Sequence, residues 1–135
     1  MQSRTLFLAR FMGVFAIFEA GWMILRREEA LALIHALLQD RVLGFSWGVF
    51  TAAAGFAVVI GHNVWRGGVL PVVVTLFGWI LLIKGAALQV LAPDVWNRFL
   101  ATVHFEANYD AILAVPLVLG LYLATAGFLH RRAKA

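Results

Sequence analysis

The chain has 135 residues, of which 63% are hydrophobic and only 13% are charged, whereas about a quarter of the residues in soluble domains are charged. Its mean hydropathy is +0.89, and its formal net charge is +4. These values exclude a soluble globular protein and predict one integral membrane domain over residues 1–135, with the lipid bilayer as its surroundings. Because the sequence contains no cysteine, disulfides, thiolate catalysis and iron–sulfur ligation are also excluded.

Four segments are long and apolar enough to cross about 30 Å of hydrocarbon. They cover about residues 5–25, 42–61, 68–91 and 109–130. Backbone polar groups inside a bilayer must be satisfied within their own segment, so each span is predicted to be a helix. The predicted fold is an all-α membrane protein, a bundle of four transmembrane helices. Basic residues flank these spans instead of forming a patch with interleaved aromatic residues, so nucleic acid is not an expected partner.

The distribution of Lys and Arg predicts the orientation of the chain. An even number of spans places both termini on one side of the membrane. Five basic residues lie on that side and four on the other: Arg4, Arg66, Arg131, Arg132 and Lys134 against Arg26, Arg27, Arg41 and Arg98. Since cytoplasmic connections carry the excess of Lys and Arg, we expect a multi-pass protein of the inner (plasma) membrane with cytoplasmic N- and C-termini.

The two connections on the outer side have the pattern of short amphipathic helices. In residues 28–40 and in residues 94–106, apolar side chains recur at helical spacing with polar side chains between them. Pro93 and Asp94 suit the start of a helix. Both segments are therefore predicted to lie as helices at the outer membrane surface. The inner connection, which contains Gly67 and Gly68, is predicted to be a tight turn.

The order span, surface helix, span occurs twice and suggests an internal repeat. At an offset of 65 residues, glycine meets glycine at Gly13 and Gly78 and at Gly55 and Gly120, and Glu19 meets Lys84. If the two halves are repeats, they have the same direction through the membrane and are related by an axis along its normal. Such an axis would bring equivalent positions face to face.

Glu19 and Lys84 are the strongest candidates for a functional site. Each is a charge deep in an apolar span, where an ionised side chain costs at least about 2.5–3.5 kcal/mol on insertion scales. Each lies thirteen residues after the start of its span region, at Leu6 and Pro71, which places both about 20 Å from the same membrane face. We expect the two side chains to touch, either as a binding or relay site or as a structural ion pair that fixes helix register.

A second group of candidates lies near the inner end of the second and third spans. His62 could titrate near neutral pH and take part in a transport cycle, with Asn63 and Trp79 as possible neighbours in a binding or relay site. The alternative is a polar turn beside an interfacial tryptophan, which is the commoner arrangement.

Metal and catalytic chemistry have weaker support. His35 and His104 could offer imidazole ligands for a metal, with carboxylates from the nearby acids Glu28, Asp40, Glu106 and Asp110, but they lack a recognisable ligand spacing. No serine or threonine has a histidine and an acid at the spacing of a catalytic triad. We therefore expect no metal, no cofactor and no catalytic residues, and an enzyme is the less favoured interpretation.

Short motifs in the middle of the chain resemble those of a known group. The run His62-Asn63-Val64-Trp65, then Thr75-Leu76-Phe77-Gly78-Trp79, then Lys84-Gly85, with Pro93 closing the helix, resembles a group of small uncharacterised bacterial integral membrane proteins. The resemblance covers the end of the second span and the third span. It implies a four-helix protein of a bacterial inner membrane and no catalytic activity.

Three functions are compatible with these features. The first is a small transporter or channel-like protein acting as an oligomer, because four helices alone rarely enclose a path and the buried charges suit transport. The second is an accessory or scaffold subunit of a larger membrane complex. The third is a lipid-binding or lipid-active protein that uses the outer helices with His104, Glu106 and Asp110.

Overall fold

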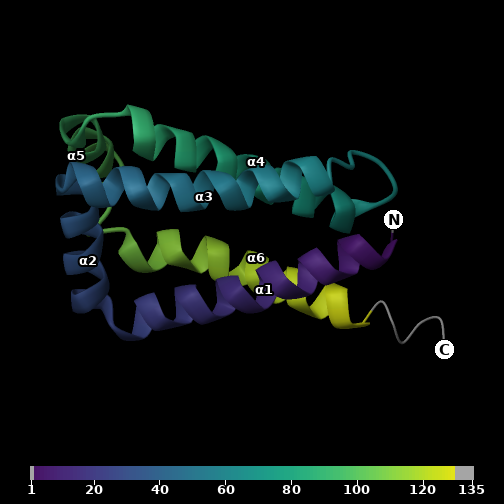
Figure 1. Ribbon diagram of the computed structural model, residues 1–135. Helices are drawn as coiled ribbons and strands as arrows, with labels where there is room; N and C mark the ends of the chain where they lie inside the picture. Colours follow the sequence, from purple (N-terminus) through teal and green to yellow (C-terminus); the bar gives the residue numbers. More distant parts are fainter. Residues whose placement is uncertain (1, 130–135) are drawn as a thin grey trace.

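The computed structural model describes residues 2–129, and this part of the chain forms six helices (Figure 1). They are α1 (Gln2–Leu25), α2 (Arg27–Gln39), α3 (Arg41–Gly61), α4 (Val69–Val90), α5 (Pro93–Thr102) and α6 (Tyr109–Leu129). Four of them, α1, α3, α4 and α6, are long and apolar enough to cross a membrane. The molecule is therefore an all-α membrane protein, as its composition predicts.

The predicted spans agree with the four long helices to within three residues at each end. The end of the last predicted span, at His130, lies outside the described residues, as do Arg131, Arg132 and Lys134. The turn between α3 and α4 is also confirmed, and Gly67 and Gly68 have φ angles of 95° and 122°, which favour glycine.

The extent of the second short helix was predicted wrongly. Residues 94–106 were expected to be helical, but α5 ends at Thr102 and turns occupy most of the connection to α6. His104 has a φ of 47°, in the left-handed region, and an α-helix cannot continue through that conformation. His104 and Glu106 therefore lie in a connection and not on a helix face.

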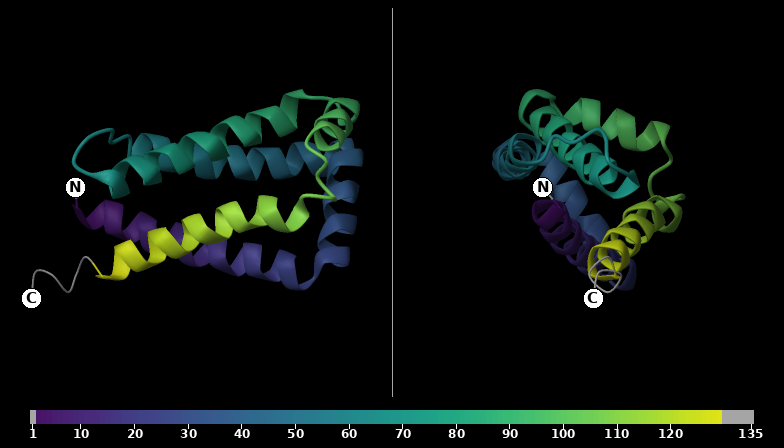
Figure 2. Two further views of the ribbon diagram at one scale, coloured as in Figure 1. Left: turned by 180° about the vertical axis from the view of Figure 1, so that it is seen from behind. Right: turned by 90° about the vertical axis from the view of Figure 1, so that its right-hand side faces the viewer.

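The long helices pack as two pairs, α1 with α6 and α3 with α4 (Figures 1 and 2). Glycines allow the close approach within each pair, because they let two backbones come together in lipid. A Cβ atom at Gly13 would lie 2.9 Å from the carbonyl oxygen of Gly120, and one at Gly48 would lie 2.8 Å from the carbonyl oxygen of Gly85. The small residues thus form the seams inside the pairs.

The two pairs correspond to one another at an offset of 65 residues. This offset relates α1 to α4, α2 to α5 and α3 to α6, so the pair α1/α6 becomes the pair α4/α3. Contacts correspond as well: Gly13 meets Ala124 as Gly78 meets Val59, and Gly120 meets Ile17 as Gly55 meets Leu82. This is the contact pattern of two parallel repeats, and it supports the internal repeat suggested by the sequence.

The two pairs meet in an apolar cluster to which all four long helices contribute. Its buried residues are Ala9, Met12, Val58, Val74 and Leu123, with Leu8, Leu70, Val73 and Phe77 among those packed against it. Most members are equivalent at the same offset: Ala9 and Val74, Met12 and Phe77, Val58 and Leu123, Leu8 and Val73. The cluster between the pairs is therefore built from equivalent positions of the two repeats.

The short helices lie at the opposite end of the bundle from the α3–α4 turn (Figure 1). There α2 runs crosswise from the end of α1 to the start of α3. Asp40 caps α3 by accepting hydrogen bonds from the backbone N–H groups of Val42 and Leu43 at 2.8 and 3.1 Å. In α5, the Arg98 guanidinium bonded to Asp94 holds the pKa of that carboxyl below its usual value. We call this the α2/α5 end and the other the His62 end.

Candidate functional site

Glu19 lies on the face of α1, and Lys84 on the face of α4, that is directed toward the other helix pair. On α1, Thr5, Met12 and Glu19 follow at intervals of seven residues, about two turns, and therefore share one face. On α4, Leu70, Phe77 and Lys84 do the same. These two faces, which we call the interpair faces, meet at the apolar cluster, because Met12, Leu70 and Phe77 all belong to it or pack against it.

Glu19 and Lys84 occupy equivalent positions on the two interpair faces, but they form no ion pair. Within residues 2–129, four ion pairs have N–O distances of 4.0 Å or less: Arg26–Glu29, Arg27–Asp110, His35–Glu106 and Arg98–Asp94. All four lie at the α2/α5 end. Glu19 and Lys84 are both exposed, so the direct contact that the sequence led us to expect is absent. The two charges lie at equivalent positions of α1 and α4, and no ion pair joins them.

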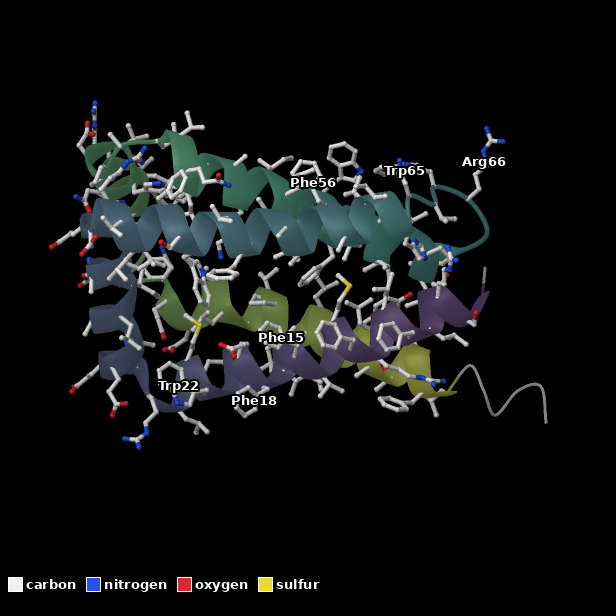
Figure 3. The ribbon with its side chains drawn as sticks, viewed as in Figure 1. Phe15, Phe18, Trp22, Phe56, Trp65 and Arg66 are labelled. Atoms are coloured by element: carbon white, nitrogen blue, oxygen red, sulfur yellow. The ribbon has the colours of Figure 1, made fainter. Side chains whose placement is uncertain are left out.

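Aromatic residues cover a different side of α1. Phe7, Phe11 and Phe15 stack in a row with ring centroids 6.3 and 6.2 Å apart, and Phe18 is 68% exposed. Phe18 points away from the α3/α4 pair (Figure 3). Exposed phenylalanines suit contact with lipid, and Phe18 marks the side of α1 that faces the bilayer. Glu19, the next residue, lies about 100° around the helix from Phe18.

At the His62 end, a buried histidine joins the two pairs. The ring Nε2 of His62 lies 2.8 Å from the hydroxyl of Thr5 on α1, and its Nδ1 lies 3.3 Å from the hydroxyl of Thr75 on α4. His62 is 3% exposed and Thr75 is fully buried. Because each hydroxyl can donate or accept a hydrogen bond, the two threonines can bond to either tautomer of the ring.

Thr75 also fixes the backbone of the α3–α4 turn. Its hydroxyl accepts a hydrogen bond from the Val64 N–H at 3.0 Å and lies 3.1 Å from the His62 carbonyl oxygen and 3.0 Å from that of Val64. Since a hydroxyl has one proton, it donates to one of these acceptors at a time. Thr75 therefore holds both the ring and the main chain of His62.

Asn63 and Trp79, the other candidates from the sequence, belong to the same region. The Asn63 side-chain oxygen accepts a hydrogen bond from the indole N–H of Trp65 at 2.7 Å and lies 3.5 Å from that of Trp79. The turn that carries Trp65 is visible at the right of Figure 3. The structure thus brings together His62, Asn63 and Trp79. In the part of the chain that the structure describes, Glu19 and Lys84 make no hydrogen bond or ion pair with this region or with each other.

Two residues of this network were not predicted as site residues. Thr75 appeared in the sequence motif and in the small-residue stripe of its helix, and its spacing from Trp79 was the available signal. Thr5 gave no signal, because a threonine at the start of an apolar span is common and nothing in the sequence places it beside His62.

A cavity of about 460 Å³ lies at the α2/α5 end, lined by His35, Asn97, Leu100, Ala101, His104, Phe105, Glu106 and Ala107. His35 Nε2 lies 3.1 Å from a Glu106 carboxylate oxygen. Among the described residues, no group of three histidine, cysteine or acidic side chains is placed to hold a metal ion. The cavity is therefore an open hollow at the surface of the bundle, lined by apolar side chains together with two histidines, Asn97 and Glu106, and within residues 2–129 it offers no set of metal ligands.

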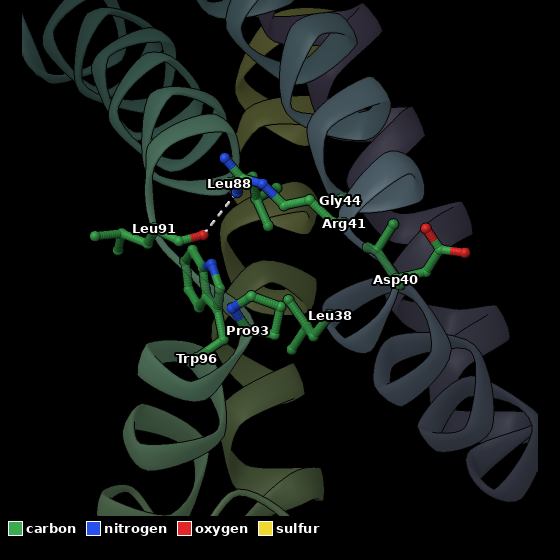
Figure 4. Close-up of a pocket in the computed structure, with 9 residues that line it drawn as sticks. Leu38, Asp40, Arg41, Gly44, Leu88, Leu91, Pro93 and Trp96 are labelled. Atoms are coloured by element: carbon green, nitrogen blue, oxygen red, sulfur yellow. Dashed lines mark hydrogen bonds between the residues drawn. The ribbon is translucent and has the colours of Figure 1, made fainter.

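A smaller pocket lies between α2, α3, α4 and α5 (Figure 4). Arg41 reaches across it and donates hydrogen bonds to the carbonyl oxygens of Leu91 at 2.9 Å and Gln89 at 2.7 Å, which caps the end of α4. The pocket also contains Gly44, and the equivalent residue of the other repeat is Tyr109, which is fully buried and fills the corresponding space. The two repeats therefore differ at this point in side-chain volume.

No family model, curated protein or solved structure matches this chain. The class of the protein follows from its fold alone: a small membrane-embedded protein with four long apolar helices.

Proposed function

We propose that the protein is a small transporter or channel-like protein in which Glu19 and Lys84 form the site that a polar solute passes. The observation that carries the proposal is that two opposite charges occupy equivalent positions on facing sides of two apolar spans, exposed and without an ion pair between them. A charge kept at this depth is costly, and it is typical of solute or ion paths.

The packing of the bundle closes this site on one side of the membrane. Met12 precedes Glu19 by seven residues, and Phe77 precedes Lys84 by the same interval; both take part in the interpair cluster. Nearer the His62 end lies the hydrogen-bonded group of Thr5, His62 and Thr75. The site is therefore closed toward the His62 end by apolar and polar contacts between the pairs. Transport requires those contacts to open, and the His62 hydrogen bonds to α1 and α4 are the ones that separation of the pairs would break.

The proposal includes the surroundings expected from the sequence. The termini and His62 face the cytoplasm, the membrane is the inner membrane of a bacterium, and α2 and α5 lie at the outer surface. A homo-oligomer or a larger membrane complex completes the path, because four helices rarely enclose one by themselves. Native mass spectrometry of the detergent-solubilised protein measures this assembly directly.

Substituted-cysteine accessibility tests the site, and the chain contains no native cysteine that would interfere. Cysteine replaces Glu19 or Lys84, and as a control it replaces Phe18, which lies at nearly the same depth on the side away from the other pair. A membrane-impermeant thiol reagent should label positions 19 and 84 at least tenfold faster than position 18, because thiols ionise in water and not in lipid.

The direction of access distinguishes transport from other functions. With the reagent on the α2/α5 side, labelling of position 19 should be fast, and with the reagent on the His62 side it should rise when His62→Ala is added. Labelling of positions 19 and 18 at equal rates would refute the proposal. It would favour an accessory subunit, whose charges meet a partner helix, or a lipid-binding protein.

A further inference from the structure

We propose that the solute of the Glu19–Lys84 site is a zwitterion, a molecule that carries an ammonium group and an anionic group together. This inference rests on the proposed function, since it names the class of solute that the same site accepts. It is carried by the combination of charge sign, equivalence of position and absence of direct pairing between the two residues.

The charges of the site select against ions of a single sign. A cation bound by Glu19 leaves the ammonium of Lys84 uncompensated and is repelled by it, and an anion bound by Lys84 leaves Glu19 uncompensated. A stranded charge in an apolar interior is strongly unfavourable. A zwitterion places its ammonium group at Glu19 and its anionic group at Lys84, so that both protein charges are compensated and the occupied site is neutral.

The neighbours of the two charges indicate an apolar portion in the solute. Met12 and Met23 lie seven residues before and four residues after Glu19, on its own face of α1, and Phe77 and Leu88 lie at the same intervals around Lys84. Met12 is buried in the interpair cluster and Leu88 against Gly48 of α3, so both line the apolar floor of the helices beside the charges. A hydrophobic α-amino acid and the headgroup region of a zwitterionic lipid both combine two charges with hydrocarbon, and the experiment separates these two sources.

The repeat makes a charge exchange between positions 19 and 84 a suitable test. Since the two positions are equivalent, Glu19→Lys combined with Lys84→Glu recreates the site with its ends reversed. A zwitterion can bind to the exchanged site after turning around. A structural role that depends on the individual surroundings of each residue would not survive the exchange.

Binding is measured by isothermal titration calorimetry on the full chain in nanodiscs made of phosphatidylglycerol, which carries no ammonium group. The probes are leucine, its cationic amide leucinamide and its anionic derivative N-acetylleucine. The lipid arm uses short-chain phosphatidylethanolamine against short-chain phosphatidylglycerol. A zwitterionic probe from one of the two arms should bind at least about tenfold more tightly than its singly charged counterparts, which is the effect of one lost charge-assisted interaction.

Three variants test which protein charge binds which charged group of the solute. Glu19→Gln should bind N-acetylleucine at least as well as leucine, Lys84→Gln should bind leucinamide at least as well, and the exchanged variant should retain the preference for the zwitterion. Size-exclusion chromatography identifies the folded variants. A wild-type protein that prefers no zwitterionic probe, or a folded exchanged variant that has lost the preference, would overturn the inference.

Failure of this inference and failure of the transport proposal are distinguishable in proteoliposomes. Facilitated uptake of leucinamide or N-acetylleucine, but not of leucine, would leave transport standing and remove the zwitterion as the solute. A zwitterion preference in binding without any uptake would leave the solute class standing and remove transport.

Discussion

Replacing Thr75 by valine tests the group that closes the His62 end. Valine has nearly the shape of threonine, so the change opens no cavity in this fully buried position. It removes the acceptor of the Val64 N–H, 3.0 Å away, and the neighbour of the His62 ring at 3.3 Å. Stranding a fully buried donor costs about 1–3 kcal/mol and one neutral hydrogen bond contributes about 1 kcal/mol. Because the Val64 N–H is partly buried, we expect a loss of about 1–3 kcal/mol.

Thr125 provides the matched control for this substitution. Its hydroxyl is exposed and bonds only to carbonyl oxygens of its own helix, those of Leu121 and Tyr122, at 2.7 and 3.1 Å. Thr125→Val should therefore change the free energy of unfolding by less than about 0.5 kcal/mol. Unfolding in mixed micelles with increasing dodecyl sulfate, followed by tryptophan fluorescence, measures both variants. If Thr75→Val were no more destabilising than Thr125→Val, the hydrogen-bonded group would not stabilise the bundle.

Three further predictions concern packing, capping and orientation. Gly13→Ala should destabilise the α1/α6 pair by about 1–3 kcal/mol through overpacking. The control Gly21→Ala, whose methyl group meets nothing within 4 Å, should not destabilise it. Equal unfolding midpoints for the two variants would contradict the close packing of α1 on α6 at Gly13. Arg10 donates from Nε to the Gly127 carbonyl oxygen at 2.8 Å and lies over the Phe128 ring. Arg10→Gln should therefore lower the free energy of unfolding by about 1.5–3 kcal/mol in the same micelle assay. Arg10→Lys, which lacks the Nε–H, should not regain this stability. Cysteine at Glu28 should react with an impermeant thiol reagent in intact cells, and cysteine at Arg66 only after permeabilisation; the reverse pattern would contradict cytoplasmic termini.

The sequence predicts the spans because their signal is one-dimensional. Twenty apolar residues need a bilayer whatever they pack against, and Gly67 and Gly68 mark the turn whatever lies beside it. The partner of each helix is a different matter, because lipid is as apolar as another helix and the hydrophobic pattern does not name a neighbour. That α1 packs on α6 and not on α3 depends on the crosswise path of α2, which hydropathy does not describe.

The sequence predicted the candidate site only in part. Counting residues from the membrane face placed Glu19 and Lys84 at the same depth, and the repeat placed them on corresponding faces. It could not give the distance between the two side chains, and the expected ion pair is absent. His62 was a candidate because of its chemistry, but its burial against Thr5 depends on a contact between residues 57 positions apart, which no local pattern reveals.

The equivalence of positions 19 and 84 bears on why a single chain carries both halves. If each half were a separate copy of one identical unit, a symmetric dimer would set like against like at this depth, two carboxylates or two ammonium groups. Joining the halves in one polypeptide allows the two positions to differ in sign, and the same freedom lets Gly44 stand where the other half has Tyr109. The linked chain can thus present a polar axis across its middle, with one acidic and one basic side, which no assembly of identical halves with this symmetry could provide.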